Sequence, residues 1–483
     1  MDISNLASKV DGKIVGFNDY YNDEGFIGKF TFLGNANPGD IVIRHWVDGK
    51  GIEIAASKNI ACLITLNPTE DALIKSNELK FPLIVCNKIE LATAFALNWA
   101  VENYAKDAKS IVITGTNGKS TTSHLIYHIL DTAGFRVFTN TDSESECNTL
   151  CDPVVSKMIV DEVVENGDLD YLVIEVSEVQ GWFDALMKGH AYLMSNALKP
   201  ICGVITNIAM DHIGLVNSID EVFDEIYQVP NAINEGSIVL NNNDKLVMKI
   251  ADNLGENIKP FYCSMNKSDS SKNNIFYDED KQCIIYDNES ILTIDELPFN
   301  TNHFIQNILS AIAACISIGI EMEDITAGVK SYKALNRRFA KLNEEPLIYD
   351  DFAHNPDGIK NTIRETKKFV GDGEFYIVCS IRGSRGVEIN QYNVEALVEA
   401  IDNKTNLILS SSCDVVNNLN FVEDEEREIF FKVLNENNIN YIHYENLSDA
   451  LKETYEKANP EDVILLIGAQ GMDPAEGILK KFI

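Results

Sequence analysis

A ten-residue stretch from Ile113 to Thr122, ITGTNGKSTT, constrains the fold of this chain more than any other feature. It begins at the end of the β-branched run SIVIT and continues into TTSHLIYHILDTAG, where apolar residues recur at helical spacing. A glycine-rich loop between a buried strand and a helix is the setting in which such loops bind phosphate. The common P-loop pattern G-x-x-x-x-G-K-[ST] would have its first glycine at position 113, which is isoleucine here, so this loop is shorter than usual.

The residues of the loop suit a nucleotide phosphate. Gly115 and Gly118 allow backbone N–H groups to turn inward, and the start of the following helix adds positive potential. Lys119 can bridge phosphate oxygens, and the hydroxyl of Ser120 is a suitable magnesium ligand. The sequence therefore predicts that a nucleotide binds at this loop.

The chain is too long for one hydrophobic core, because 483 residues correspond to about three domains. Short apolar runs separated by turn residues predict a small α/β domain over residues 1–108. Residues 109–334 alternate strand and helix patterns, as in a central P-loop ATPase-type parallel sheet. Residues 335–483 show the same alternation, as in a Rossmann-like domain, so we expect an α/β protein of three domains. The acidic, Asn-rich segment 264–282 is expected to be a surface insertion.

The charge balance narrows the choice of partners. With 40 basic and 74 acidic residues the net charge is −34, which would repel DNA or RNA. The sequence has no apolar run long enough to span a membrane and begins without the pattern of a signal peptide. We expect a cytoplasmic monomer that binds small molecules and neither nucleic acid nor membrane. Its ten scattered cysteines are expected to be reduced and mostly buried rather than zinc ligands.

Acidic and histidine side chains follow two further predicted strands. Glu175 ends the strand in YLVIEV, and Asp211 and His212 follow the strand in CGVITNIAMDHIG. Ligands of an open α/β sheet bind at the carboxyl ends of its strands. These side chains are therefore expected to converge on the bound phosphates.

The motifs GTNGKST, EVS, TNIAMDH, NRRF and YDDFAHNPDGI resemble, in order and approximate spacing, those of the Mur ligases. The resemblance covers residues 109–360 by motif and the C-terminal domain by architecture. Mur ligases are related to folylpolyglutamate and cyanophycin synthetases. In the family, ATP phosphorylates a substrate carboxylate, an amine attacks the acyl phosphate, and ADP and phosphate are released. The short loop is the family's own form of the P-loop.

The resemblance implies roles for individual residues. Lys119 would contact the β- and γ-phosphates, Ser120 and Glu175 would hold a first Mg²⁺, and His212 would bind a second one. The loop residues implied to surround ATP are Gly115, Thr116, Asn117, Gly118, Lys119, Ser120 and Thr121.

Three further segments are implied to reach the nucleotide. His303 and Asn307 match adenine-contacting positions, although both could instead only stabilise a core helix. Arg338 matches an arginine at the start of the third domain, and the adjacent Arg337 leaves the register open by one residue. Asp351, with His354 and Asn355, matches a segment that closes over ATP, where Asp351 would contact the ribose or a magnesium-bound water.

Three departures concern the substrates. Many Mur ligases have a carbamylated lysine soon after the DH histidine, but residues 220–233 contain none, and Glu225 or Gln228 is a weak substitute. The resemblance is MurE-like, yet the D-N-P-R motif for diaminopimelate is absent. Arg382 and Arg385 could bind an amino-acid carboxylate instead, or could be solvated loop residues. The first domain also lacks the usual D-S-R signature, and archaeal pseudomurein peptide ligases are the preferred branch.

The function expected from the sequence is an ATP- and Mg²⁺-dependent ligase that adds an amino acid to a UDP-linked peptide in murein or pseudomurein synthesis. A related ligase acting on a folate-, polyamino-acid- or tetrapyrrole-type carboxylate is one alternative. A non-catalytic nucleotide-binding subunit is another, and a small-molecule kinase would leave the DH and DDFAH segments without a role.

Overall fold

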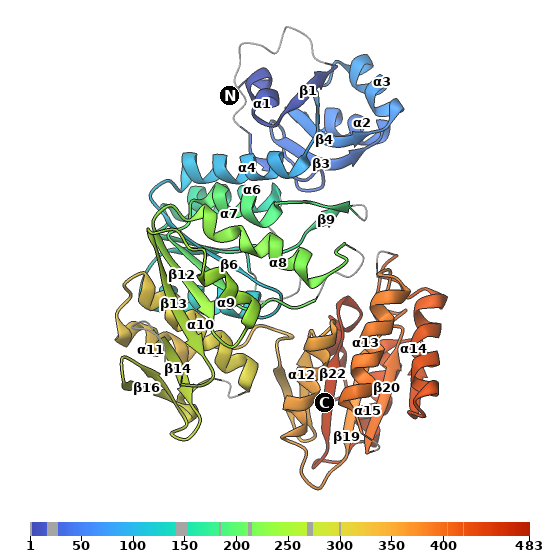
Figure 1. Cartoon of the computed structure of the whole chain (residues 1–483). Coiled ribbons are helices and arrows are strands. Elements are labelled where there is room, and N and C mark those ends of the chain that lie inside the picture. The colour runs from blue at the N-terminus through green and yellow to red at the C-terminus, as the bar shows by residue number, and fades with distance from the viewer. Residues whose placement is uncertain are drawn as a thin grey trace.

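The computed structural model describes residues 2–16, 28–141, 153–182, 185–210, 215–267, 274–298, 301–402, 404–418 and 420–483. Within these ranges the chain forms three α/β domains, each built on its own sheet (Figure 1). The expected fold class is therefore confirmed. Among the residues described, none of the helices is long and apolar enough to cross a lipid bilayer.

The N-terminal domain has a sheet of five described strands in the order β1-β5-β4-β3-β2, with β1 antiparallel to β5 and the others parallel. Helices α1 and α4 cover one face of this sheet, and α2 and α3 cover the other. The elements are α1 (Ile3–Lys9), β1 (Gly12–Val15), β2 (Phe30–Thr31), β3 (Ile41–Val47), α2 (Gly49–Ser57), β4 (Cys62–Pro68), α3 (Glu70–Leu79), β5 (Leu83–Cys86) and α4 (Ile89–Tyr104).

Helix α4 belongs to two hydrophobic cores. Its first half packs into the N-terminal core and its second half into the core of the central domain. The buried residues of the two halves are Ile89, Ala92 and Ala96, and Leu97, Ala100 and Val101, respectively. Figure 1 shows α4 lying between the N-terminal sheet and helices α6 and α7 of the central domain. The first two domains are thus joined by a continuous helix and not by a loop.

The central domain has a sheet of nine described strands in the order β16-β15-β14-β13-β12-β11-β6-β8-β7. The strands from β7 to β14 run parallel, while β15 and β16 form an antiparallel extension. Its strands are β6 (Lys109–Thr114), β7 (Val137–Thr139), β8 (Tyr171–Glu175), β11 (Cys202–Ile205), β12 (Gly236–Asn241), β13 (Ile258–Ser264), β14 (Asn274–Asp278), β15 (Cys283–Tyr286) and β16 (Glu289–Thr293), with a separate hairpin of β9 (Gly181–Trp182) and β10 (Ala185–Leu186). Its helices are α5 (Lys119–Thr132), α6 (Pro153–Asn166), α7 (His190–Leu198), α8 (Ile219–Tyr227), η2 (Val229–Ala232), α9 (Lys245–Ala251), η3 (Ile294–Glu296), α10 (Asn302–Ser317) and α11 (Met322–Ser331).

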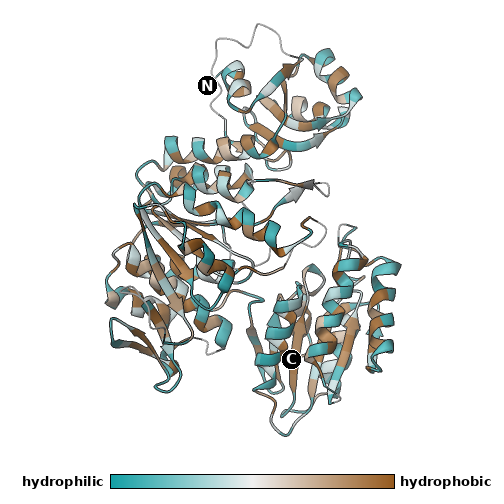
Figure 2. Cartoon of the chain, viewed as in Figure 1, coloured by the Kyte–Doolittle hydropathy of each residue, from teal (hydrophilic) through white to brown (hydrophobic). Residues whose placement is uncertain are grey.

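The central strands β6, β8 and β11 are buried almost throughout because helices cover both faces of the sheet. In β6, Ile111 and Ile113 pack against α5, α10 and α11, whereas Val112 packs against α4, α6 and α7. Figure 2 shows the same arrangement, with hydrophobic strands enclosed by helices whose hydrophilic residues face outward.

The segment 264–282, expected as a surface insertion, is in part a component of the sheet. Residues Asn274–Asp278 form β14, which pairs with β13 and β15. Ile275 and Tyr277 are 1% and 6% exposed and belong to the main core. This strand was not predicted because only alternate residues of β14 are buried, and the remaining residues give the segment its polar, acidic composition.

The C-terminal domain has a sheet of six described strands in the order β17-β18-β22-β19-β20-β21, parallel except for β17. Helices α12 to α14 pack on one face, and α15 and α16 pack on the other. The elements are β17 (Ala340–Glu344), β18 (Leu347–Asp351), α12 (Pro356–Lys367), β19 (Phe375–Ser380), α13 (Val387–Ala400), β20 (Thr405–Ser410), α14 (Asp424–Glu436), β21 (Tyr441–Tyr444), α15 (Leu447–Lys457), β22 (Val463–Ile467), η4 (Gln470–Met472) and α16 (Ala475–Leu479).

Eight cysteines lie in the described part of the chain. All eight are unpaired and seven are buried, as expected from the sequence.

Candidate active site

Three parallel strands bring the candidate residues to one edge of the central sheet. In the register of the sheet, Ile205 of β11 lies opposite Thr114 of β6, and Glu175 of β8 lies opposite Ile113. The phosphate loop, Glu175 and the segment after β11 therefore meet at the carboxyl ends of the strands, as the sequence predicted.

The phosphate loop is hydrogen-bonded to the segment that follows β11. The N–H of Thr116 donates to the carbonyl of Asn207 at 2.9 Å. The side chain of Asn207 holds Asn117 in both directions, accepting from its N–H at 2.9 Å and donating to its carbonyl at 2.8 Å. Asn207 is not among the residues predicted from the sequence, although it stands in the TNIAMDH motif directly after the strand. This side chain therefore fixes the backbone of the phosphate loop.

Both glycines of the loop occupy conformations that other residues rarely adopt. Gly115 has φ +125° and Gly118 has φ +83°. A Cβ atom at Gly115 would lie 2.2 Å from the hydroxyl of Thr206, and one at Gly118 would lie 2.3 Å from Oδ1 of Asn307. Asn307, on α10, is thereby placed directly against the loop.

Lys119 is turned back toward its own loop. Its ammonium donates to the carbonyl of Gly115 at 2.6 Å, to the carbonyl of Thr116 at 2.9 Å and to Oε2 of Glu178 at 2.6 Å. The side chain of Glu178 is 0% exposed. Glu178 is not among the residues predicted from the sequence, where its only signal is its place as a second acidic residue three positions after Glu175.

Glu175 and Ser120 carry oxygen atoms of the kind that a magnesium ion binds. Asn140 fixes the backbone of Glu175 through hydrogen bonds of 2.8 and 2.9 Å, and the hydroxyl of Thr141 lies 3.4 Å from its Oε2. The hydroxyl of Ser120 lies at the start of α5. Carboxylate and hydroxyl oxygens are the donors that Mg²⁺ prefers, so these residues fit the predicted ion.

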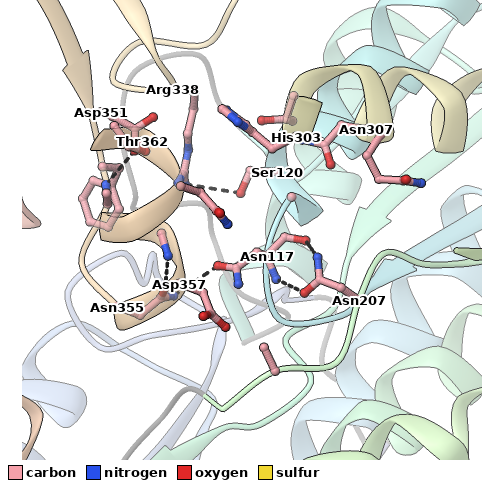
Figure 3. Close-up of a pocket in the computed structure, with 18 of the residues that line it drawn as sticks. Asn117, Ser120, Asn207, His303, Asn307, Arg338, Asp351, Asn355, Asp357 and Thr362 are labelled. Carbon is pink, nitrogen blue, oxygen red and sulfur yellow. Dashed lines mark hydrogen bonds between the residues drawn. The ribbon is translucent and has the colours of Figure 1, made fainter. Parts of the chain in front are cut away.

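A pocket of about 470 Å³ separates the central and C-terminal domains. One wall comes from the phosphate loop, the segment after β11 and the start of α10. The opposite wall comes from Arg338, the end of β18 and the first turns of α12 (Figure 3). The predicted residues that line it are Asn117, Gly118, Ser120, Thr121, His303, Asn307, Arg338, Asp351, His354 and Asn355. Gly115, Thr116, Lys119 and Glu175 do not line it.

The two adjacent arginines have different environments. Arg338 lines the pocket, and its Nη2 lies 3.4 Å from the hydroxyl of Ser120. Arg337 is 6% exposed and donates to Asp350, Asp473 and the carbonyls of residues 468 and 469. Of the two arginines that the sequence left open, Arg338 is therefore the one that lines the pocket and approaches the start of α5 after the phosphate loop.

The segment after β18 contributes the other contact across the pocket. Nδ2 of Asn355 donates to Oδ1 of Asn117 at 3.1 Å, while Oδ1 of Asn355 caps α12 by accepting from the N–H of Gly358 at 2.8 Å (Figure 3). Asp351 is held by the hydroxyl of Thr362 at 3.0 Å. His354 is oriented by a 2.9 Å contact between its Nδ1 and the carbonyl of Phe352.

His303 lies at the apolar end of the pocket. Its ring is 4.8 Å from that of Phe304 and 5.9 Å from that of Phe339. Burial lowers the pKa of His303, and Asp351 opposes this effect. A neutral imidazole beside aromatic rings suits an uncharged ligand group such as a nucleobase. The roles assigned to these residues toward ATP stay predictions.

Some predicted residues lie elsewhere. Asp211 and His212 fall outside the described residues. Glu225 accepts from the N–H of Gly189 at 2.9 and 3.0 Å, and Nε2 of Gln228 donates to the carbonyl of Asp224 at 3.2 Å. Neither side chain lines the pocket, so the geometry gives no support to either as a replacement for the carbamylated lysine.

Arg382 and Arg385 belong to a loop after β19 and do not line the pocket. The carboxylate of Glu426, which is 2% exposed, accepts from the N–H groups of Ser384, Arg385 and Gly386 at 2.6 to 2.9 Å. Three consecutive amides around one carboxylate fix the backbone of this loop. The side chain of Arg385 is itself exposed.

Comparison with known proteins identifies two domains. Residues 113–315 match the Mur ligase middle domain, and residues 337–470 match the Mur ligase, glutamate ligase domain. A UDP-N-acetylmuramate–L-alanine ligase of Clostridium acetobutylicum is 26% identical over 375 residues, which cover 74% of this chain and 73% of the relative.

Solved structures share the fold over nearly the whole chain. MurF from Acinetobacter baumannii has a TM-score of 0.66 at 16% identity and covers 99% of this chain and 98% of its own. A pseudomurein peptide ligase type C from Methanothermus fervidus has a TM-score of 0.57 at 19% identity and covers 92% and 94%. Members of the family are ATP-dependent ligases that form amide bonds. With both characteristic domains in the same order around the phosphate loop, the chain belongs to the Mur ligase family.

Proposed function

We propose that this protein adds an amino acid to the carboxylate of a UDP-linked peptide precursor of a murein or pseudomurein cell wall, with ATP as the energy source. One observation carries the proposal. The pocket has the phosphate loop on one wall and the C-terminal domain on the other, and Arg338 and Asn355 reach across it to Ser120 and Asn117. Relatives and structural neighbours that act on cell-wall precursors support the choice of substrate class.

In the proposed reaction, an oxygen of the acceptor carboxylate attacks the γ-phosphorus and the bond to the bridging oxygen breaks, releasing ADP. Lys119 and the inward N–H groups of the loop stabilise the charge on the phosphates. Mg²⁺ held by Ser120 and Glu175 would screen the two anions as they approach each other. The amine of the incoming amino acid then attacks the acyl phosphate, and phosphate leaves as the amine loses a proton.

The acyl phosphate must be kept from water, which favours a closed arrangement of the two domains. Arg338 and Asn355 support this role because each comes from the C-terminal domain and touches the phosphate loop or the helix after it. We therefore infer that binding of ATP tightens the contact between the domains.

The loop of Arg382 and Arg385 is the proposed site for the carboxylate of the incoming amino acid. An arginine can hold a carboxylate through two parallel hydrogen bonds. The backbone of the loop is fixed by Glu426, while the side chain of Arg385 is exposed to solvent. The N-terminal domain would hold the UDP portion of the acceptor.

The test is release of ADP from ATP and Mg²⁺, with murein- and pseudomurein-type UDP-peptides as acceptors and a panel of amino acids. The Lys119→Ala variant is the blank. Release that requires both one acceptor and one amino acid would support the proposal and identify both substrates. Release only with folate-, polyamino-acid- or tetrapyrrole-type acids would replace the acceptor. ATP binding without turnover on any acid would favour a non-catalytic subunit.

A further inference from the structure

The ammonium of Lys119 has no donor left over for a phosphate in this structure. An ammonium carries three N–H donors, and within the described part of the chain three groups accept from it, the carbonyls of Gly115 and Thr116 and the carboxylate of Glu178, at distances of 2.6 to 2.9 Å. The pocket is lined by the neighbours of Lys119 on both sides, but not by Lys119 itself. A nucleotide can therefore contact this lysine only if one of the three acceptors gives way.

Glu178 differs from the other two acceptors in its origin. The two carbonyls belong to the loop that contains Lys119 and move with it. Glu178 belongs to the segment after β8, where the hydroxyl of Ser177 donates to the carbonyl of Val179 at 2.6 Å and closes a tight turn. Its carboxylate is 0% exposed, so Lys119 supplies the positive charge that a buried carboxylate requires.

We propose that Glu178 is the counter-ion of Lys119 until ATP binds and that the terminal phosphate of ATP then takes its place. This inference rests on the proposed nucleotide site. The exchange leaves the negative charge of Glu178 beside the incoming phosphates, where like charges repel. A divalent cation removes this repulsion, because it can lie between the carboxylate and the phosphate oxygens. Glu178 thereby makes the site discriminate between ATP with its cation and ATP without it.

The experiment measures the dissociation constant of ATP by calorimetry, with Mg²⁺ and with EDTA, for the full chain. The informative variant is Glu178→Gln, which keeps the shape of the side chain and removes the charge. The matched control is Asp462→Asn. Asp462 is another buried carboxylate, 2% exposed, which accepts from the N–H groups of Glu374 and Asn459 at 2.7 Å and does not line the pocket.

In the wild type, ATP is expected to bind at least about tenfold more weakly in EDTA than with Mg²⁺. In Glu178→Gln the ratio of the dissociation constant in EDTA to that with Mg²⁺ should fall by about tenfold, chiefly because ATP binds more tightly in EDTA. Asp462→Asn should keep the wild-type difference. A ratio in Glu178→Gln within about twofold of the wild type would overturn the inference, and so would a loss of ATP binding in EDTA.

Two further outcomes separate this inference from the proposed function. If Glu178→Gln does not fold, Glu178→Ala is measured instead, and the ratio must fall in the same direction, since this substitution also removes the charge. An unchanged ratio there would also overturn the inference. If the wild type binds no ATP under either condition, the nucleotide site itself is refuted, and the inference fails with it.

Discussion

The adjacent arginines at the start of the C-terminal domain predict opposite effects of the same substitution. Arg337→Met should destabilise the domain, whereas Arg338→Met should weaken ATP binding and leave stability almost unchanged. Arg337 is 6% exposed and pairs with Asp350, which is 1% exposed. Arg338 instead reaches the hydroxyl of Ser120 at 3.4 Å across the pocket.

The expected loss follows from what Arg337 leaves behind. Burial raises the pKa of Asp350 to about 6, and the guanidinium of Arg337 opposes that rise. Without the guanidinium, Asp350 is a buried carboxyl group with no compensating charge from that side chain, and the carbonyls of residues 468 and 469 lose a donor. Removing one partner of a buried ion pair costs about 3–5 kcal/mol. For a domain of this size the melting temperature should fall by about 6–20 °C.

Thermal unfolding followed by circular dichroism measures this difference, with Arg338→Met as the matched control. Arg338→Met should melt within about 2 °C of the wild type, because Arg338 is only partly buried and methionine keeps an apolar contact with the ring of Phe352, so the cost should be about 0.5 kcal/mol. Its Kd for ATP should rise by about tenfold through loss of a charged contact. Equal melting temperatures for the two variants would refute the structural role assigned to Arg337.

Three further predictions concern other buried charges. Lys119→Met should lower stability by about 3–5 kcal/mol because it strips Glu178 of its cation, and adding Glu178→Gln should restore most of the loss in urea unfolding; equal stabilities would contradict the buried pair. Burial lowers the pKa of His190 from 6.5 to about 4. The unfolded chain therefore binds this proton more readily, and the free energy of unfolding should fall by about 3 kcal/mol from pH 6.5 to pH 4, a loss that His190→Gln should not show. Glu426→Ala should release the loop of Arg385 and raise the KM for the amino acid about tenfold, while the KM for ATP stays constant, in steady-state assays.

Local patterns predicted the parts of the site that depend on local structure. The strand, glycine turn and helix around the phosphate loop are neighbours in sequence, and burial on both faces makes the central parallel strands continuous apolar runs. The three-domain α/β architecture and the convergence of Glu175 with the loop followed from these signals. The acidic strand β14 was not predicted because its buried residues alternate with less buried ones in a segment rich in charged residues.

The sequence could not assign partners that meet only in three dimensions. Nothing in the spacing of Glu178 indicates that its carboxylate reaches Lys119, because that contact depends on the turn after β8. The two arginines of NRRF are adjacent residues of the same type, so the sequence alone cannot tell which of them is buried and which reaches the pocket. A backbone φ of +58° at Arg337 turns the two side chains in different directions, and that angle is set by the fold of the linker into β17.

The helix shared by the first two domains limits how substrate specificity could be transferred between relatives. If only residues 1–108 were exchanged, the side chains at positions 97, 100 and 101, which are Leu97, Ala100 and Val101 here, would come from the relative and pack in the native central core. Placing the junction before α4 would instead leave the N-terminal core with a foreign set of residues at Ile89, Ala92 and Ala96. Either chimaera would pair one native core with half of an unmatched helix, at the usual cost of mispacked side chains. The N-terminal domain can therefore be inherited or engineered as a module only when both halves of α4 are exchanged together with the residues that they contact.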